Sequence, residues 1–130
     1  MKELLLVLLF IANSVFAQTS GAPIHNIMRL QIAPSTDALF ALQGKSSLTE
    51  KEWSTLNLQL ESLHAGAHTL KKLTLNTVWQ KHANEVDRLS ELATAQSNDR
   101  NIRGLTRTGN SLYQVCESCH NHFFPDGKNL

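Results

Sequence analysis

The chain has 130 residues, and its 12 lysine and arginine residues against 11 aspartate and glutamate residues give a net charge of +1. This balance provides neither the basic stripe typical of nucleic-acid binding nor the acidic block typical of a charged tail. A chain of this length suits one domain of modest size, so the function has to be sought in local motifs.

Residues 1–17 predict a secretory signal peptide. Lys2 precedes an unbroken apolar run over residues 4–12, and Ala17 is the small residue expected before a cleavage site. The run is too short to span the ~30 Å hydrocarbon core of a bilayer, so no membrane anchor is expected after processing. We therefore predict a mature domain of residues 18–130, exported to the periplasm.

The segment 22–44 predicts the first helix of this domain. Pro34 lies inside it and should kink or split the helix, because proline lacks the N–H group that a helix interior needs. Gly44 is a suitable residue to end it. The candidate inward-facing residues are Ile24, Ile27, Met28, Leu39, Phe40 and Leu42.

Three further segments repeat apolar residues at alternating spacings of three and four, which is typical of helices packed side by side. Their predicted inward positions are Trp53, Leu56, Leu60, Leu63, Ala67 and Leu70; then Trp79, His82, Val86, Leu89 and Ala93; then Ile102, Leu105, Gly109, Leu112, Cys116 and Cys119. No long pattern of period two competes with them. We therefore expect an all-α fold, an antiparallel four-helix bundle.

The predicted helix boundaries agree with this count. Thr49 and Glu52 form a capping-box pattern, and Asn76 is a second candidate N-cap. Asn98 with Asp99 is expected to open the last helix, and the turn residues 125–127 are expected to close it. The segment 71–77 is expected to be a turn or a frayed helix end, with a short strand as the alternative.

The most specific motif is C-x-x-C-H, formed by Cys116, Cys119 and His120. On a helix these three residues share one face. Two thiols spaced in this way can bond the two vinyl groups on one edge of a porphyrin, and a histidine is a standard axial ligand of haem iron. The motif therefore predicts one covalently attached haem c, lying against the apolar side chains of the bundle.

Other chemistries use the same residue types. A thioredoxin-like redox pair begins a helix in an α/β fold, whereas Cys116 and Cys119 lie near the end of a predicted helix, where the backbone dipole disfavours a thiolate. A zinc site needs a fourth ligand, such as His122 or a distant histidine. A disulfide would close too small a loop to restrict the unfolded chain much.

With "CESCH" near its end, the preceding helix "NIRGLTRTGNSLYQV" and three earlier helices, the chain resembles the class II c-type cytochromes, the cytochrome c-prime family. The resemblance implies that a residue of the first helix approaches the other face of the haem. Met28 is the candidate sixth ligand, with core filling as the alternative, and His25 is a second candidate ligand. Arg29 is the candidate contact of a haem propionate. The sequence departs from the family pattern at Pro34 and at Phe124, which occupies a position where a basic residue is common.

The resemblance implies an exported electron carrier that serves a redox partner protein and can form a homodimer. A five-coordinate cytochrome that binds nitric oxide or carbon monoxide is the alternative, and a haem-free zinc-binding helical domain is a third reading. No general acid, nucleophile or carboxylate pair accompanies the motif, so an enzyme is not predicted. His64 and His68 have a spacing that can hold a metal ion, but Leu63 and Ala67 occupy the predicted inner face, so the two histidines are expected to point outward.

Overall fold

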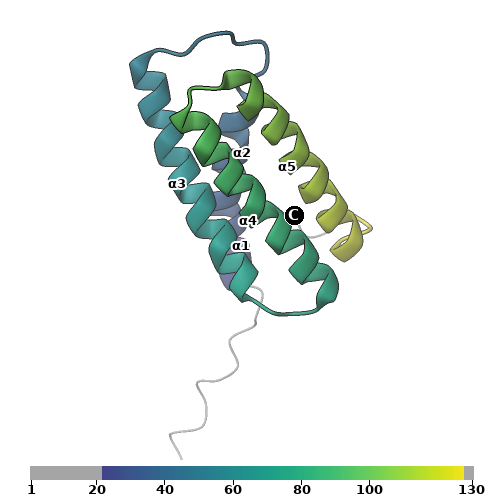
Figure 1. Cartoon of the computed structure of the whole chain (residues 1–130). Coiled ribbons are helices and arrows are strands. Elements are labelled where there is room, and N and C mark those ends of the chain that lie inside the picture. Colours follow the sequence, from purple (N-terminus) through teal and green to yellow (C-terminus); the bar gives the residue numbers. More distant parts are fainter. Residues whose placement is uncertain (1–21, 128–130) are drawn as a thin grey trace, which may run out of the picture.

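The computed structural model describes residues 22–127, and the predicted signal peptide lies outside this range. Every regular element in the described range is helical (Figure 1), which confirms the all-α class. The elements are α1 (Ala22–Ile27), η1 (Met28–Ile32), α2 (Ala33–Phe40), α3 (Glu50–Lys72), α4 (Thr77–Asn98) and α5 (Ile102–Phe123). Since α1, η1 and α2 follow one another without interruption, they form one composite helix, and the described chain has four helices. None of these helices combines the length and apolar character needed to cross a membrane.

Each of the four helices packs against two others. α3 contacts α4, α4 contacts α5, and the composite helix contacts α3 along its length and α5 through α2. Figure 1 shows α3, α4 and α5 lying side by side, joined by the short connections 73–76 and 99–101. The side chains that face inward from all four helices therefore share one core.

The core confirms most of the predicted inward positions. All six positions assigned on α3 are buried, and on α5 Leu105 and Leu112 are completely buried. Toward the end of α5, Cys116 and Cys119 are only half-buried, although they continue the same face. The core is thus tightly closed near the middle of α5 and less closed around the cysteines.

Two of the predicted helix starts are confirmed. The hydroxyl of Thr49 accepts a hydrogen bond from the N–H of Glu52, whose carboxylate accepts one from the N–H of Thr49. The side-chain oxygen of Asn76 accepts from the N–H of Trp79. These bonds satisfy N–H groups that have no partner within the first helical turn.

The predicted start of the last helix was wrong by about one turn. Asn98 is the final residue of α4, and Asn101 caps α5 by accepting a hydrogen bond from the N–H of Gly104. Between them Arg100 has a left-handed backbone with φ of 51°. The chain therefore reverses at Arg100, and of three nearby polar candidates for the cap only Asn101 follows that reversal.

Pro34 neither splits the composite helix nor bends it as a simple kink. The turn before it widens into the π-helical segment η1, where the N–H of Ala33 donates to the carbonyl of Met28, five residues earlier. A proline ring would clash with the carbonyl four residues before it in a regular α-helix, and a wider turn moves that carbonyl away. Pro34 itself occupies the first turn of α2, where its missing N–H group has least effect.

Candidate functional site

A cavity opens at the end of the helices where the core is less closed. It holds about 700 Å³ of space free of protein atoms, part of it open to solvent. The lining residues are Met28, Ile32, Ala33, Thr36, Leu70, Trp79, His82, Ala83, Val86, Val115, Cys116, Cys119 and His120.

The three residues of the C-x-x-C-H motif lie together on this cavity. Cys116, Cys119 and His120 occupy the last two turns of α5, and all three line the wall. Helical spacing explains why, because residues three and four apart lie on one face of a helix. The predicted placement of both thiols and the imidazole on one helix face is confirmed.

Met28 lines the same cavity from a different helix. It begins η1 and is half-buried. The Cα atoms of η1 and α5 nowhere approach within 8 Å, although α2, which follows η1, does pack against α5. The cavity thus occupies a gap between the helix that carries Met28 and the helix that carries His120.

Burial disfavours the charged form of both thiols. Both cysteines are free, and burial raises the pKa of Cys116 to about 11, with a smaller contribution from neighbouring Cys119. Burial also raises the pKa of Cys119. A redox-active pair needs a lowered thiol pKa, because the thiolate is the nucleophile. The environment of these cysteines therefore weighs against a thioredoxin-like function.

The motif does not form a prearranged zinc site. Among residues 22–127, only one group of three or more His, Cys, Asp and Glu residues has its ligand atoms within 4.8 Å of one another. It consists of His64, Asp87 and Glu91, which lie far from the motif in sequence. A structural zinc ion needs four ligands around one point, and cysteine ligands have to be deprotonated. Cys116 and Cys119 do not meet the first condition in this arrangement, because no third ligand atom of this kind among the described residues lies within that distance of both.

Arg29 and His25 have less direct positions. Both side chains are exposed, and neither belongs to the cavity wall. Arg29 follows Met28 directly on η1, next to the wall. Its contact with a propionate stays a prediction, and so does the ligand role considered for His25.

His82 contacts the motif in a way that the sequence pattern did not reveal. Its Nδ1 lies 2.8 Å from the carbonyl oxygen of Val78, and its Nε2 lies 3.1 Å from the hydroxyl of Ser118, between the two cysteines. Because a carbonyl only accepts, Nδ1 carries the proton, and Nε2 of the neutral ring accepts from Ser118. Helical spacing correctly placed His82 on the inner face of α4, but spacing within one helix does not identify a partner on another.

The wall between these polar groups is apolar. Trp79 is buried, and its indole N–H donates to the carbonyl of Leu70 at 3.0 Å, so that its polar group is satisfied away from the cavity. Ala83, Val86 and Val115 add only hydrocarbon surface. The site therefore combines a sulfur pair, two imidazoles and a thioether with largely apolar surroundings.

Comparison of the chain with protein-family models, with curated proteins and with solved structures found no match. The resemblance to class II c-type cytochromes stays a prediction, and the functional assignment depends on the site.

Proposed function

We propose that this chain is an exported c-type cytochrome that transfers electrons through one covalently attached haem. The observation that carries the proposal is the presence of Met28, Cys116, Cys119 and His120 on one apolar cavity. These residues lie on two separate helices. The sulfur pair would hold one edge of a porphyrin, and the thioether and the imidazole would hold its two faces.

The residues present fit a haem. Cys116 and Cys119 would hold its edge through thioether bonds, each formed when a thiol S–H adds across one vinyl group. His120 of α5 and Met28 of η1 would bind its iron. When bound, the haem supplies an iron ion that alternates between the ferrous and ferric states.

The protein's own contribution is to exclude water and fix the ligands. Leu70, Val86 and Val115 line the cavity with hydrocarbon, which lowers the local dielectric constant. Burial of this kind is one of the means by which a protein sets the reduction potential of a metal centre. His82 and Ser118 join α4 to the turn of α5 that carries the motif, and so limit its movement.

An antiparallel four-helix bundle is the arrangement that we propose for the scaffold. It is supported by the contacts of each helix with two others and by the short connections 73–76 and 99–101. Short loops join neighbouring helices that run in opposite directions. In such a bundle, cofactor sites are built from side chains of facing helices, as the groups on η1 and α5 are here.

A gas-binding cytochrome is the second candidate, and one observation favours it. Ile32 and Ala33, which follow Met28 on the cavity wall, are apolar. If Met28 does not bind the iron, the vacant coordination position would face a hydrocarbon wall, which suits small uncharged molecules such as nitric oxide and carbon monoxide. The occupancy of the sixth position by Met28 separates the two functions.

The mass of the exported protein tests the proposal. We expect the chain produced in a host with cytochrome maturation machinery to lack residues 1–17 and to carry one haem that survives denaturing electrophoresis. Cys116→Ala together with Cys119→Ala should abolish covalent haem, whereas Ser118→Ala, between them, should retain it. A wild-type mass equal to that of the bare processed polypeptide, with both thiols free, would contradict the proposal and favour a haem-free helical domain.

A further inference from the structure

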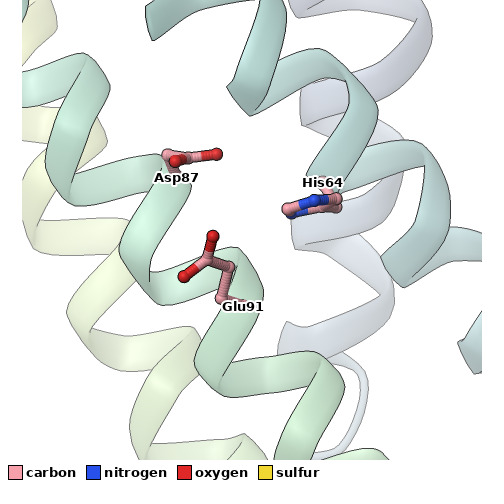
Figure 2. A group of neighbouring side chains, drawn as sticks. All are labelled: His64, Asp87 and Glu91. Carbon is pink, nitrogen blue, oxygen red and sulfur yellow. The ribbon is translucent and has the colours of Figure 1, made fainter.

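A second cluster of metal-ligand types lies between α3 and α4. A ring nitrogen of His64 on α3 and one carboxylate oxygen each from Asp87 and Glu91 on α4 all lie within 4.8 Å of one another. Figure 2 shows the two carboxylates of α4 on the side that faces His64. No residue of this cluster lines the cavity that holds the C-x-x-C-H motif.

Asp87 is the unusual member of the cluster, because its charge is buried and only half satisfied. Its side chain is 4% exposed, and Oδ2 accepts a hydrogen bond from Nζ of Lys71 at 2.9 Å. Oδ1 has no hydrogen-bond partner among the residues that the structure describes. Nδ1 of His68 lies 3.9 Å from Oδ1, which is too long for a hydrogen bond. A buried carboxylate oxygen without a partner is unfavourable, and a cation bound to Oδ1 would relieve this cost.

The hydrogen bonds of His64 occupy one of its ring nitrogens and leave the other with a lone pair. The hydroxyl of Ser90 lies 2.6 Å from the carbonyl oxygen of Asp87 and donates to it, so it has no second proton for His64. Nδ1 of His64, 3.2 Å from the same hydroxyl, therefore donates to Ser90. Nε2 of the neutral ring keeps a free lone pair. Metal-binding histidines are commonly held by a hydrogen bond at the other ring nitrogen in this way.

We propose that His64, Asp87 and Glu91 form a binding site for a divalent transition-metal ion of the zinc class. Zinc accepts imidazole nitrogen and carboxylate oxygen at about 2.0–2.2 Å, and three protein ligands with a water molecule complete a common coordination. The imidazole favours zinc, copper or nickel over calcium and magnesium, which prefer oxygen alone. His68, one helical turn after His64 and 3.9 Å from Asp87, is a candidate for an additional donor.

Lys71 offers a competing account of the cluster, and the two accounts predict different behaviour. Its ammonium group already neutralises part of the charge of Asp87, but it is 44% exposed and can move into solvent. If Lys71 is the sole counterion, the cluster is an ion pair and zinc has no preferred position there. If the cluster binds zinc, the ammonium competes with the metal for Asp87, and its removal should strengthen zinc binding.

Zinc binding by the tag-free exported protein tests this proposal. After chelator treatment, we expect calorimetry with zinc alone to show a site with one zinc ion per chain. His64→Ala and Glu91→Gln should each weaken it about 10-fold or more, since even indirect ligand contacts affect affinity by that factor. His122→Ala, an exposed histidine of α5, is the matched control and should leave the affinity unchanged. Equal zinc affinity in the wild type, His64→Ala and Glu91→Gln would overturn the proposal.

Lys71→Gln provides the second test. We expect it to bind zinc more tightly than the wild type, and we expect zinc to raise its melting temperature more than that of the wild type. If zinc leaves the melting temperature of Lys71→Gln unchanged, and this variant binds zinc no more tightly than the wild type, the cluster is a simple ion pair. That result would overturn the proposed metal site. Glu91 is exposed, so Glu91→Gln remains an interpretable variant even if a substitution at buried Asp87 prevents folding. Iron measured in the same samples reports the haem separately, so the two proposals fail or succeed independently.

Discussion

Nε2 of His82 on α4 lies 3.1 Å from the hydroxyl of Ser118 on α5, which stands between the two cysteines of the motif. The other ring nitrogen donates to the carbonyl of Val78, so the imidazole is held from both sides. The turn of α5 that carries both thiols is therefore joined to α4 by a side chain that lines the cavity.

A double-mutant cycle should detect this connection. We expect His82→Ala and Ser118→Ala to show a coupling free energy of about 0.5–1.5 kcal/mol, the usual net contribution of one hydrogen bond. Urea unfolding of the wild type, both single variants and the double variant measures it. Strictly additive losses of stability would mean that the contact contributes nothing to the folded state.

Met28→Ala should change the spin state of the proposed haem without releasing it. Removal of a thioether ligand leaves the iron five-coordinate, so the absorption spectrum should move from low-spin to high-spin features while the covalent bonds at Cys116 and Cys119 persist. Leu30→Ala, at an exposed position of the same turn that does not line the cavity, is the control and should keep the wild-type spin state. A wild-type spectrum that is already high-spin would remove Met28 as a ligand and favour the gas-binding alternative.

Gly66→Ala should destabilise the protein although alanine is the better helix former. An added Cβ would lie 3.0 Å from Cβ of Gln31 and 3.0 Å from Cδ1 of Ile32, so these side chains of η1 would have to give way by a few tenths of an ångström. The helix propensity alone would favour alanine by about 1 kcal/mol, whereas overpacking costs about 1–3 kcal/mol. We therefore expect a net loss of about 1 kcal/mol in thermal or urea unfolding.

Ala65→Gly, at the exposed neighbouring position, measures the propensity term on the same helix. It should lower the free energy of unfolding by about 1 kcal/mol. If Gly66→Ala instead raised stability by a similar amount, η1 and α3 would not be in the close contact described above.

Glu52→Gln should affect stability in a pH-dependent way. The side-chain hydrogen bond from Lys45 and the bonds from Thr49 lower the pKa of Glu52 to about 2, from an ordinary value of 4.5. A carboxylate with a lowered pKa stabilises the folded state above the unfolded-state pKa, and this contribution is lost as the pH falls from 4.5 toward 2. The wild type should therefore exceed Glu52→Gln in stability at pH 7 by more than at pH 3.

The measurement is urea unfolding at both pH values, with Glu61→Gln, an exposed residue of the same helix, as the control. Because Glu52 is at the surface, added salt should reduce the effect. A difference between wild type and Glu52→Gln that stays constant from pH 7 to pH 3 would contradict the assignment.

The predictable parts of this structure are those that depend on residues close in sequence. The spacing of Leu56, Leu60 and Leu63 indicated which face of α3 is buried, and Thr49 with Glu52 marked where that helix begins. These features follow from helical geometry within a few residues. The shared face of Cys116 and His120 was predictable for the same reason.

Contacts between helices were not predictable from spacing alone. His64 and His68 were expected to point outward, and His68 is exposed, but His64 hydrogen-bonds to Ser90 on α4. The position of Ser90 depends on how α3 and α4 pack. The unpartnered oxygen of Asp87 depends on the same packing, because Asp87 reads in the sequence as an ordinary polar residue of a helix surface.

The widened turn at Met28–Ile32 contains one residue more than an α-helical turn, so it acts as a single-residue insertion. Removal of one residue from this turn, with Pro34 replaced by alanine, would restore regular geometry and rotate the preceding chain by about 100° around the helix axis. Met28 would then leave the cavity wall, while Leu39 beyond the turn would keep its place in the core. Which side chain of the first helix meets the cavity is thus decided by the number of residues between it and the proline, and a change in that number would take Met28 out of the site without a substitution of Met28 itself.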